Sequence, residues 1–124
     1  MKQEKFSIKK RIQSFSHAFN GIKILLSEEH NVSIHLLAAC ITILLGFILH
    51  ISITEWIALL FAIGFVLAME AINSAIENLA DYVSPDKNEL IKKVKDLSAA
   101  AVLISATTAL VVGLIIFLPK IIAL

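Results

Sequence analysis

Long uncharged stretches, separated by charged segments, dominate the pattern of this chain of 124 residues. Two of them, 31–54 and 97–118, contain no Asp, Glu, Lys or Arg. A helix rises about 1.5 Å per residue and needs about 20 residues to cross the hydrocarbon core of a bilayer, so each stretch is long enough. A third stretch begins at Trp56 and keeps helical spacing beyond Met69 into an acidic segment. The pattern predicts an all-α integral membrane protein with spans at about 33–50, 56–80 and 97–118.

The segment before the first span carries an apolar stripe. The stripe consists of Ile8, Ile12, Phe15, Phe19, Ile22 and Leu26. These residues recur in alternating steps of four and three, which is the spacing of one face of a helix. Basic residues lie off this face, so we expect an amphipathic helix over about 7–29 that rests on the cytoplasmic headgroups. A helix packed on a partner subunit would show the same spacing.

The distribution of lysine and arginine predicts the orientation in the membrane. Six of these residues precede the first span, four lie between the second and third spans, and only Lys120 follows the third. Basic residues favour the cytoplasmic side, so we expect the N-terminus and the 82–96 loop in the cytoplasm and the C-terminus outside. The first 30 residues lack the apolar core of a signal peptide. We therefore expect a single domain over 1–124 in the cell inner or plasma membrane.

Composition agrees with a membrane location and excludes several functions. Apolar residues make up 58% of the chain and charged residues 17%, an excess of apolar residues over an average soluble domain. The net charge of +1 makes a nucleic acid an improbable partner. Cys40 is the only cysteine, so no intrachain disulfide can form. No glycine precedes a Lys-Ser or Lys-Thr pair, so the chain has no phosphate-binding loop of the usual kind.

The second span ends in a polar face. Glu70, Asn73, Ser74, Glu77 and Asp81 are spaced so that they fall within an arc of roughly 100° on one side of a helix. A carboxylate that faces lipid is costly, so this face must point to protein, water or a cation. Hydrogen bonds between helices are the structural alternative, and Asp81 could simply end the helix.

Other polar residues arrive at the same membrane depth. Glu29 comes directly before the first span, and Lys95 and Asp96 come before the third. Carboxylate oxygens at an aqueous edge suit Mg²⁺ that is held partly by phosphate, and a lysine there suits a phosphate. Glu70 lies deeper than Glu77, as suits a general base. His35 and His50 are interpreted as polar groups at the ends of spans rather than as ligands.

The motif EAINSAIENLAD at 70–81, followed by KDLSAAAVLI at 95–104, resembles the prokaryotic diacylglycerol kinase family of small membrane lipid kinases. The resemblance covers nearly the whole chain. It implies a homotrimer with three spans per subunit, ATP as phosphoryl donor and Mg²⁺ as cofactor. It also implies active sites at the cytoplasmic face that are shared between neighbouring subunits.

The resemblance also implies roles for individual residues. Glu70 would be the catalytic base that meets the lipid substrate and takes the proton from its hydroxyl. Glu29 and Glu77 would hold the cation together with the ATP phosphates, and Asn73, Ser74 and Asp81 would support that cluster. The remaining contacts to ATP would come from Lys10, His17, Asp86, Lys87, Asn88, Lys95 and Asp96.

Three short strings resemble the Gram-positive branch of the family. They are EEHNVSIH at 28–35, EW at 55–56 and FLPK at 117–120, and His35 stands where the Gram-negative enzymes typically carry Glu. His17 stands where a tyrosine is common. The usual acceptor in the Gram-positive branch is undecaprenol, so we expect an undecaprenol kinase. The alternatives are a diacylglycerol kinase with the same site and, more remotely, a non-enzymatic cation-conducting oligomer.

Overall fold

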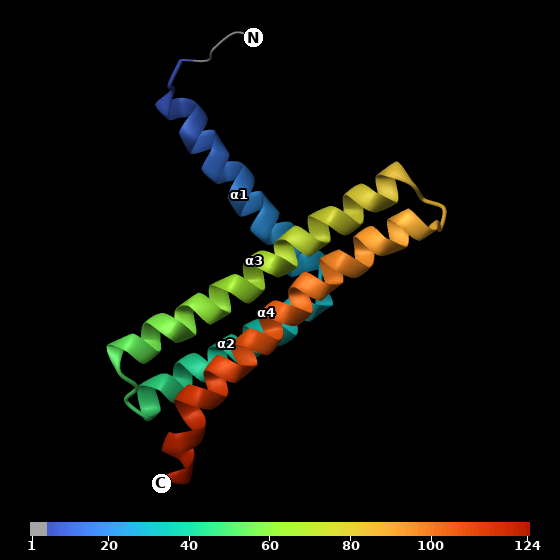
Figure 1. The fold of residues 1–124 in the computed structure, drawn as a ribbon. Helices are drawn as coiled ribbons and strands as arrows, with labels where there is room; N and C mark the ends of the chain where they lie inside the picture. Colours follow the sequence, from blue (N-terminus) through green and yellow to red (C-terminus); the bar gives the residue numbers. More distant parts are fainter. Residues whose placement is uncertain (1–4) are drawn as a thin grey trace.

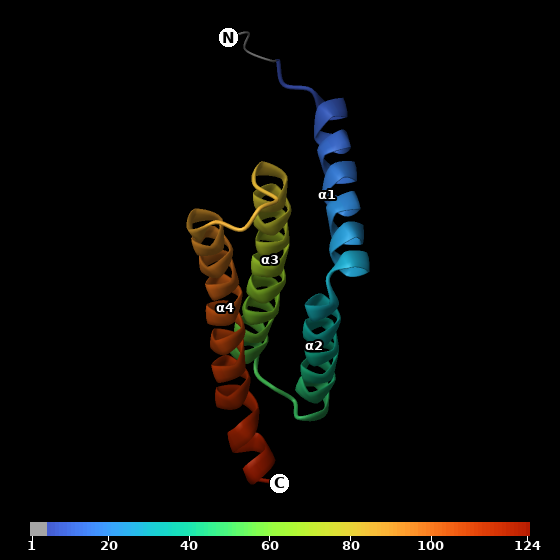
Figure 2. The same ribbon diagram turned by 90° about the vertical axis from the view of Figure 1, so that its right-hand side faces the viewer.

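The computed structural model describes residues 5–124 and contains α-helices and no strands over that range. Its helices are α1 (Ile8–Glu28), α2 (His30–Ile48), α3 (Ile53–Val83) and α4 (Glu89–Ile122). The last three lie side by side, whereas α1 leaves the N-terminal end of α2 and projects away from them (Figure 1, Figure 2). Lys2, one of the basic residues counted in the predicted orientation, lies outside the described residues.

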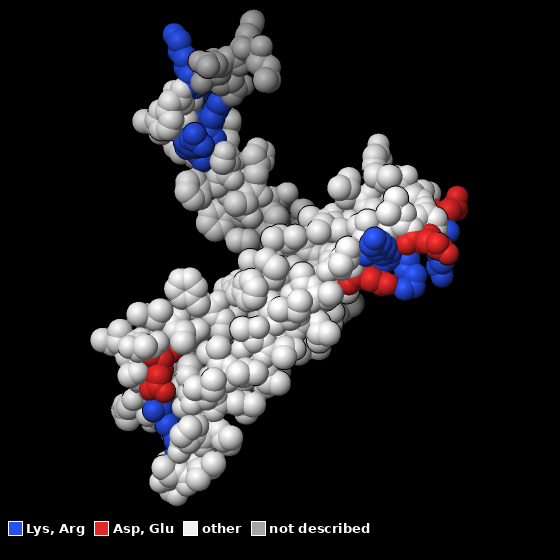
Figure 3. Space-filling view, viewed as in Figure 1, with Lys and Arg blue, Asp and Glu red and all other residues white. Residues whose placement is uncertain are grey.

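Helices α2, α3 and α4 are each long and apolar enough to cross a membrane. The prediction of an all-α chain with three candidate spans is therefore confirmed. α2 begins at His30 and α3 ends at Val83, so both helices extend beyond the spans expected from the apolar pattern. On the face drawn in Figure 3, charged residues gather over α1, at the α3–α4 turn and at the opposite end of the bundle. The surface between these two ends is uncharged on that face.

A single residue, Glu29, separates α1 from α2. Its backbone is extended, with φ −106° and ψ 108°, so one continuous helix cannot run through it. The Glu29 N–H still donates to the Leu25 carbonyl at 3.2 Å, which closes the last turn of α1. Leu25 and Val32, on either side of the break, are buried. The junction is therefore packed, whereas the N-terminal half of α1 is exposed.

The α2–α3 turn closes the end of the bundle opposite to Glu29. Ser52 and Glu55 form a capping box, in which each side chain accepts a hydrogen bond from the other residue's backbone N–H. Trp56 packs so closely on Gly46 that a Cβ at Gly46 would lie 2.7 Å from the indole ring. Lys120, near the end of α4, pairs with Glu55 at 3.1 Å between Nζ and Oε1. These contacts hold the three spanning helices together at this end.

Helices α3 and α4 are antiparallel and pack together along their length, whereas α2 contacts α3 over a shorter region. Asn88 caps the N-terminus of α4, because its side chain accepts a hydrogen bond from the Ile91 N–H at 2.9 Å. Because α2 packs little against α4, a pocket remains among the three helices.

Candidate active site

Glu70 is the most deeply buried carboxylate in the described part of the chain. It lies on α3 and is 2% exposed. The Nε2 atom of His35, on α2, lies 3.0 Å from its Oε1 atom within hydrogen-bond distance. An isolated carboxylate at this depth would be costly, so the contact with His35 stabilises it.

Glu29 reaches the same face of α3 one turn further along. The Ser74 hydroxyl donates to its Oε1 atom at 2.8 Å. The extended backbone at Glu29 makes this contact possible, because it turns the residue out of both neighbouring helices. The break between α1 and α2 thus brings a carboxylate from the first cytoplasmic segment of the sequence to the acidic face of α3.

Glu77 follows Ser74 by three residues, so the two side chains are neighbours on the surface of α3. Its side chain is half-buried, and within residues 5–124 no hydrogen bond or ion pair engages its carboxylate. Ser74 is therefore linked to Glu29 by a hydrogen bond and neighbours Glu77 by helical spacing. Among the described residues, no group of three or more His, Cys, Asp or Glu side chains is close enough to hold a metal ion by itself.

Asn73 points to a different helix from Ser74. Its Oδ1 atom accepts a hydrogen bond of 2.6 Å from the Ser98 hydroxyl of α4. The polar face of α3 is therefore divided between its neighbours. Glu70 contacts α2, Ser74 contacts Glu29, and Asn73 contacts α4.

An open cavity of about 470 Å³ lies at the α3–α4 turn, and because most of its lining residues are polar or charged we call it the polar cavity. Many of the predicted nucleotide contacts line it, namely Asp86, Lys87, Asn88, Lys95 and Asp96, together with Asp81. Lys95 pairs with Asp81 across the two helices, and Lys92 pairs with Asp96 along α4 at 2.6 Å. Both lysines are thus held by carboxylates of this chain, at a partly exposed surface.

The single chain does not gather all of the predicted site residues. Lys10 and His17 lie in the exposed N-terminal half of α1, which projects away from the α3–α4 turn (Figure 1). The other predicted residues lie on α3, at the α1–α2 break, or around the α3–α4 turn.

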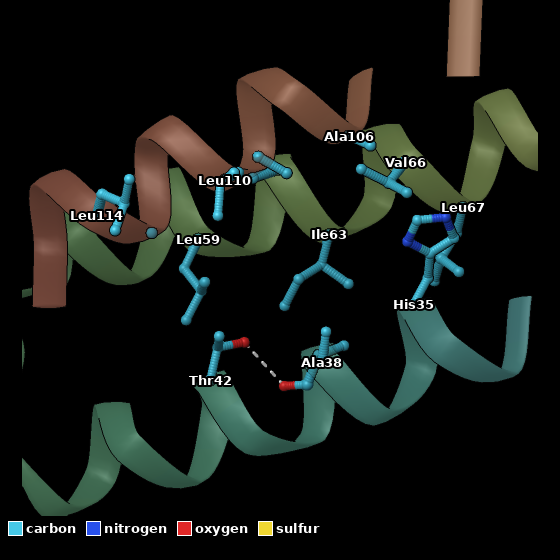
Figure 4. A pocket seen from close by; sticks show the side chains of 14 residues that line it. His35, Ala38, Thr42, Leu59, Ile63, Val66, Leu67, Ala106, Leu110 and Leu114 are labelled. Carbon is cyan, nitrogen blue, oxygen red and sulfur yellow. Dashed lines mark hydrogen bonds between the residues drawn. The ribbon is translucent and has the colours of Figure 1, made fainter. Parts of the chain in front are cut away.

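An apolar pocket of about 370 Å³ extends from His35, the partner of Glu70, into the bundle. His35 and Leu67 lie at one end of it, and Leu59 and Leu114 lie toward the other (Figure 4). Its walls are small or aliphatic side chains of α2, α3 and α4, such as Ala38, Ala106 and Gly113. His35 therefore borders the pocket and contacts the buried carboxylate at the same time.

The sequence pattern predicts His35 only as a polar group at the end of a span and does not predict its contact with Glu70. It does not single out Ser98, the partner of Asn73, either. Both residues sit in apolar surroundings, which is a signal for a polar partner, but the partner depends on how the helices pair. Helical spacing within one segment does not contain that information.

Comparison with known proteins identifies the family to which this chain belongs. The family model described as "Prokaryotic diacylglycerol kinase" matches residues 16–117. The chain is 35% identical over 119 residues to an undecaprenol kinase of Bacillus subtilis, an alignment that covers 96% of this chain and 97% of that protein. It is 31% identical over 94 residues to a diacylglycerol kinase of Haemophilus influenzae, covering 76% of this chain and 80% of that protein.

A diacylglycerol kinase of Synechocystis is 30% identical over 112 residues, covering 90% of this chain and 64% of that protein. These proteins share one activity, phosphorylation of a lipid, and the helices of this chain provide three candidate spans. A non-enzymatic oligomer, the remote alternative, therefore has no support. The chain belongs to the prokaryotic diacylglycerol kinase family and is a membrane lipid kinase.

Proposed function

We propose that this lipid kinase transfers the γ-phosphoryl group of ATP to the hydroxyl of undecaprenol. The relative that matches almost its full length is an undecaprenol kinase. The observation that carries the site assignment is the position of Glu70. It is a buried carboxylate whose partner, His35, borders an apolar pocket.

In the proposed reaction, Glu70 accepts the proton of the lipid hydroxyl. The freed oxygen bonds to the γ-phosphorus, and the bond from that phosphorus to the bridging oxygen breaks, leaving its electron pair on ADP. The pocket is too small for a whole polyprenyl chain. It receives the part next to the hydroxyl, and the rest of the chain lies along the apolar surface of α2 and α4.

The carboxylates next to Ser74 fit a magnesium ion. Mg²⁺ prefers oxygen ligands and commonly uses one or two carboxylates together with substrate phosphates and water. Glu29, held at α3 by Ser74, and Glu77 would supply those carboxylates. When bound, the ion neutralises charge on the phosphates of ATP. Ser74 holds Glu29 toward α3, and Asn73 and Asp81 support the same region.

The polar cavity at the α3–α4 turn is the proposed nucleotide site. Asp86, Lys87 and Asn88 line it from the turn, and Lys95 and Asp96 line it from α4. In this proposal Lys95 exchanges its contact with Asp81 for a phosphate oxygen when ATP binds. A lysine can do so readily because its ammonium group is a point charge on a flexible stem.

A homotrimer would complete the site. Lys10 and His17 belong to the proposed nucleotide contacts, yet α1 projects away from the turn of its own chain (Figure 1). Large apolar side chains of α3, among them Phe61 and Leu79, are also exposed in the single chain. Both observations support subunits that pack on α3 and lend α1 to a neighbouring site.

The proposed orientation places this site at the cytoplasmic face, where ATP is available. The basic residues around α1 and at the α3–α4 turn support it, because such residues favour the cytoplasmic side. In the same arrangement, the exposed apolar stripe of α1 rests in the headgroup region.

Diacylglycerol is the second candidate acceptor, because several relatives are diacylglycerol kinases. The two acceptors can be compared with purified protein in mixed micelles that contain undecaprenol or dioleoylglycerol, with labelled ATP. We expect a higher kcat/KM with undecaprenol. A higher kcat/KM with dioleoylglycerol would make diacylglycerol the acceptor of the reaction, and the proposed roles of the catalytic residues would stay the same.

A further inference from the structure

The buried carboxylate of Glu70 has one hydrogen-bonding side chain among residues 5–124, and that side chain is His35. The two residues come from different helices, so the contact also links α2 to α3. Glu70 is 2% exposed, whereas His35 is 24% exposed. The histidine is therefore the more accessible member of the pair.

The direction of this hydrogen bond follows from the chemistry of the base. A carboxylate that is ready to accept a proton is ionised and can only accept hydrogen bonds. The Nε2 atom of His35 must then carry the hydrogen and donate it to Oε1 of Glu70. A neutral imidazole with its hydrogen on Nε2 suffices for this role.

The second carboxylate oxygen of Glu70, Oε2, differs from Oε1 in its hydrogen bonding. No described residue donates a hydrogen bond to Oε2. Among the described residues, however, no fully buried side-chain oxygen or nitrogen lacks a partner. Oε2 therefore keeps a small accessible surface. Oε1 is held by His35, whereas Oε2 makes no hydrogen bond to the described residues and is not fully buried.

His35 also borders the apolar pocket among α2, α3 and α4 (Figure 4). We propose that His35 is a positioning residue that fixes Oε1 of Glu70, so that Oε2 faces the hydroxyl of the lipid acceptor. This inference rests on the proposed role of Glu70 as the base. His35 does not take the proton itself, because the proton moves from the lipid hydroxyl to Glu70.

Two substitutions of His35 separate the effect of its hydrogen bond to Glu70 from the effect of losing the imidazole ring. His35→Leu removes the donor, and we expect kcat with undecaprenol to fall about a hundredfold, the cost of a misplaced catalytic group. The KM for ATP stays unchanged, because His35 acts on the acceptor side. His35→Gln carries an amide N–H at a similar reach, and we expect it to recover most of kcat. His50→Asn, at the far end of the bundle, is the matched control for loss of an imidazole and keeps wild-type kinetics.

A double substitution tests whether His35 acts through Glu70. We expect Glu70→Gln to be severely impaired and the addition of His35→Leu to cause no further loss. Wild-type turnover of Glu70→Gln would overturn the proposed base itself. An impaired Glu70→Gln together with a fully active His35→Leu would overturn only the positioning role.

Three other results would also overturn the role of His35. The first is a His35→Leu variant with a raised KM for ATP and an unchanged kcat. The others are equal losses of kcat in His35→Gln and His35→Leu, and a kcat of the double variant below that of Glu70→Gln. Circular dichroism and binding of a non-hydrolysable ATP analogue check that each variant is folded. If His35→Leu does not fold, the kcat of His35→Gln decides, because the proposal requires it to stay near the wild-type value.

Discussion

At the scale of single residues, the acidic face of α3 contains carboxylates in different environments. Glu70 is buried and hydrogen-bonded to His35, whereas Glu77 is half-buried and engages no described side chain. Glu29 is hydrogen-bonded to Ser74, one turn before Glu77 on α3. A buried carboxylate suits proton transfer, and accessible carboxylates suit a hydrated cation.

These environments predict different kinetic effects. Glu77→Gln removes a proposed charged ligand, so we expect the KM for Mg-ATP to rise at least about tenfold, the scale seen for weakened metal sites. Steady-state kinetics at varied Mg²⁺ would measure it. The matched control is Glu28→Gln, which removes a neighbouring exposed carboxylate that lies outside the proposed site. An unchanged KM for Mg-ATP in Glu77→Gln would contradict the assignment.

Ser74→Ala tests the link between Glu29 and α3. The substitution deletes the hydroxyl that donates to Glu29, a hydrogen bond to a charged group worth about 1.5–3 kcal/mol. We expect weaker Mg-ATP binding with unchanged helix content, measured by titration calorimetry and circular dichroism. Ser33→Ala, at an exposed position of α2, is the control. Equal affinities for the Ser74 and Ser33 variants would remove Ser74 from the site.

At the scale of the elements, the sequence predicts the helices better than their contacts. Apolar length is enough to predict three spans, because a bilayer requires every backbone group in a span to be satisfied within its own helix. The break at Glu29 and the pairs His35–Glu70 and Asn73–Ser98 depend on how the helices pack. The spacing predicts that Glu70, Asn73 and Ser74 share a face of α3, but the structure is needed to show that they contact different neighbours.

The far end of the bundle offers a test of packing. Gly46→Ala places a Cβ 2.7 Å from the Trp56 ring, so we expect a loss of about 1–3 kcal/mol from overpacking. Thermal unfolding in detergent would measure the loss as a lower midpoint. Gly21→Ala is the control, because a Cβ there meets nothing within 4 Å. If both variants unfold at the same temperature, the close packing of α2 on Trp56 is wrong.

At the scale of the whole molecule, the face drawn in Figure 3 carries charge at the two ends of the bundle and uncharged surface between them. The end that carries the α3–α4 turn also carries Glu29, Glu77 and the polar cavity. In the proposed site, the lipid substrate and the water-soluble nucleotide meet where this end reaches the membrane surface. The proposed orientation places that end in the cytoplasm.

The orientation in the membrane can be tested by labelling single cysteines introduced at the two ends of the bundle. In a Cys40→Ser background, Asp86→Cys marks the α3–α4 turn and Leu124→Cys marks the C-terminus. We expect a membrane-impermeant maleimide to label Asp86→Cys in sealed inside-out vesicles and Leu124→Cys only in right-side-out cells or vesicles. The opposite labelling pattern would place the proposed site on the outer face, where ATP is not supplied.

The central claim is that Glu70 is the base of an undecaprenol kinase. The most direct test measures transfer of γ-labelled phosphate from ATP to undecaprenol by the wild-type protein and by Glu70→Gln, together with ATP binding by both. We predict labelled undecaprenyl phosphate from the wild type, and a rate at least about a hundredfold lower for the variant with ATP binding retained. Wild-type turnover by Glu70→Gln would contradict the role of Glu70, and a wild-type protein that leaves undecaprenol unlabelled would contradict the acceptor.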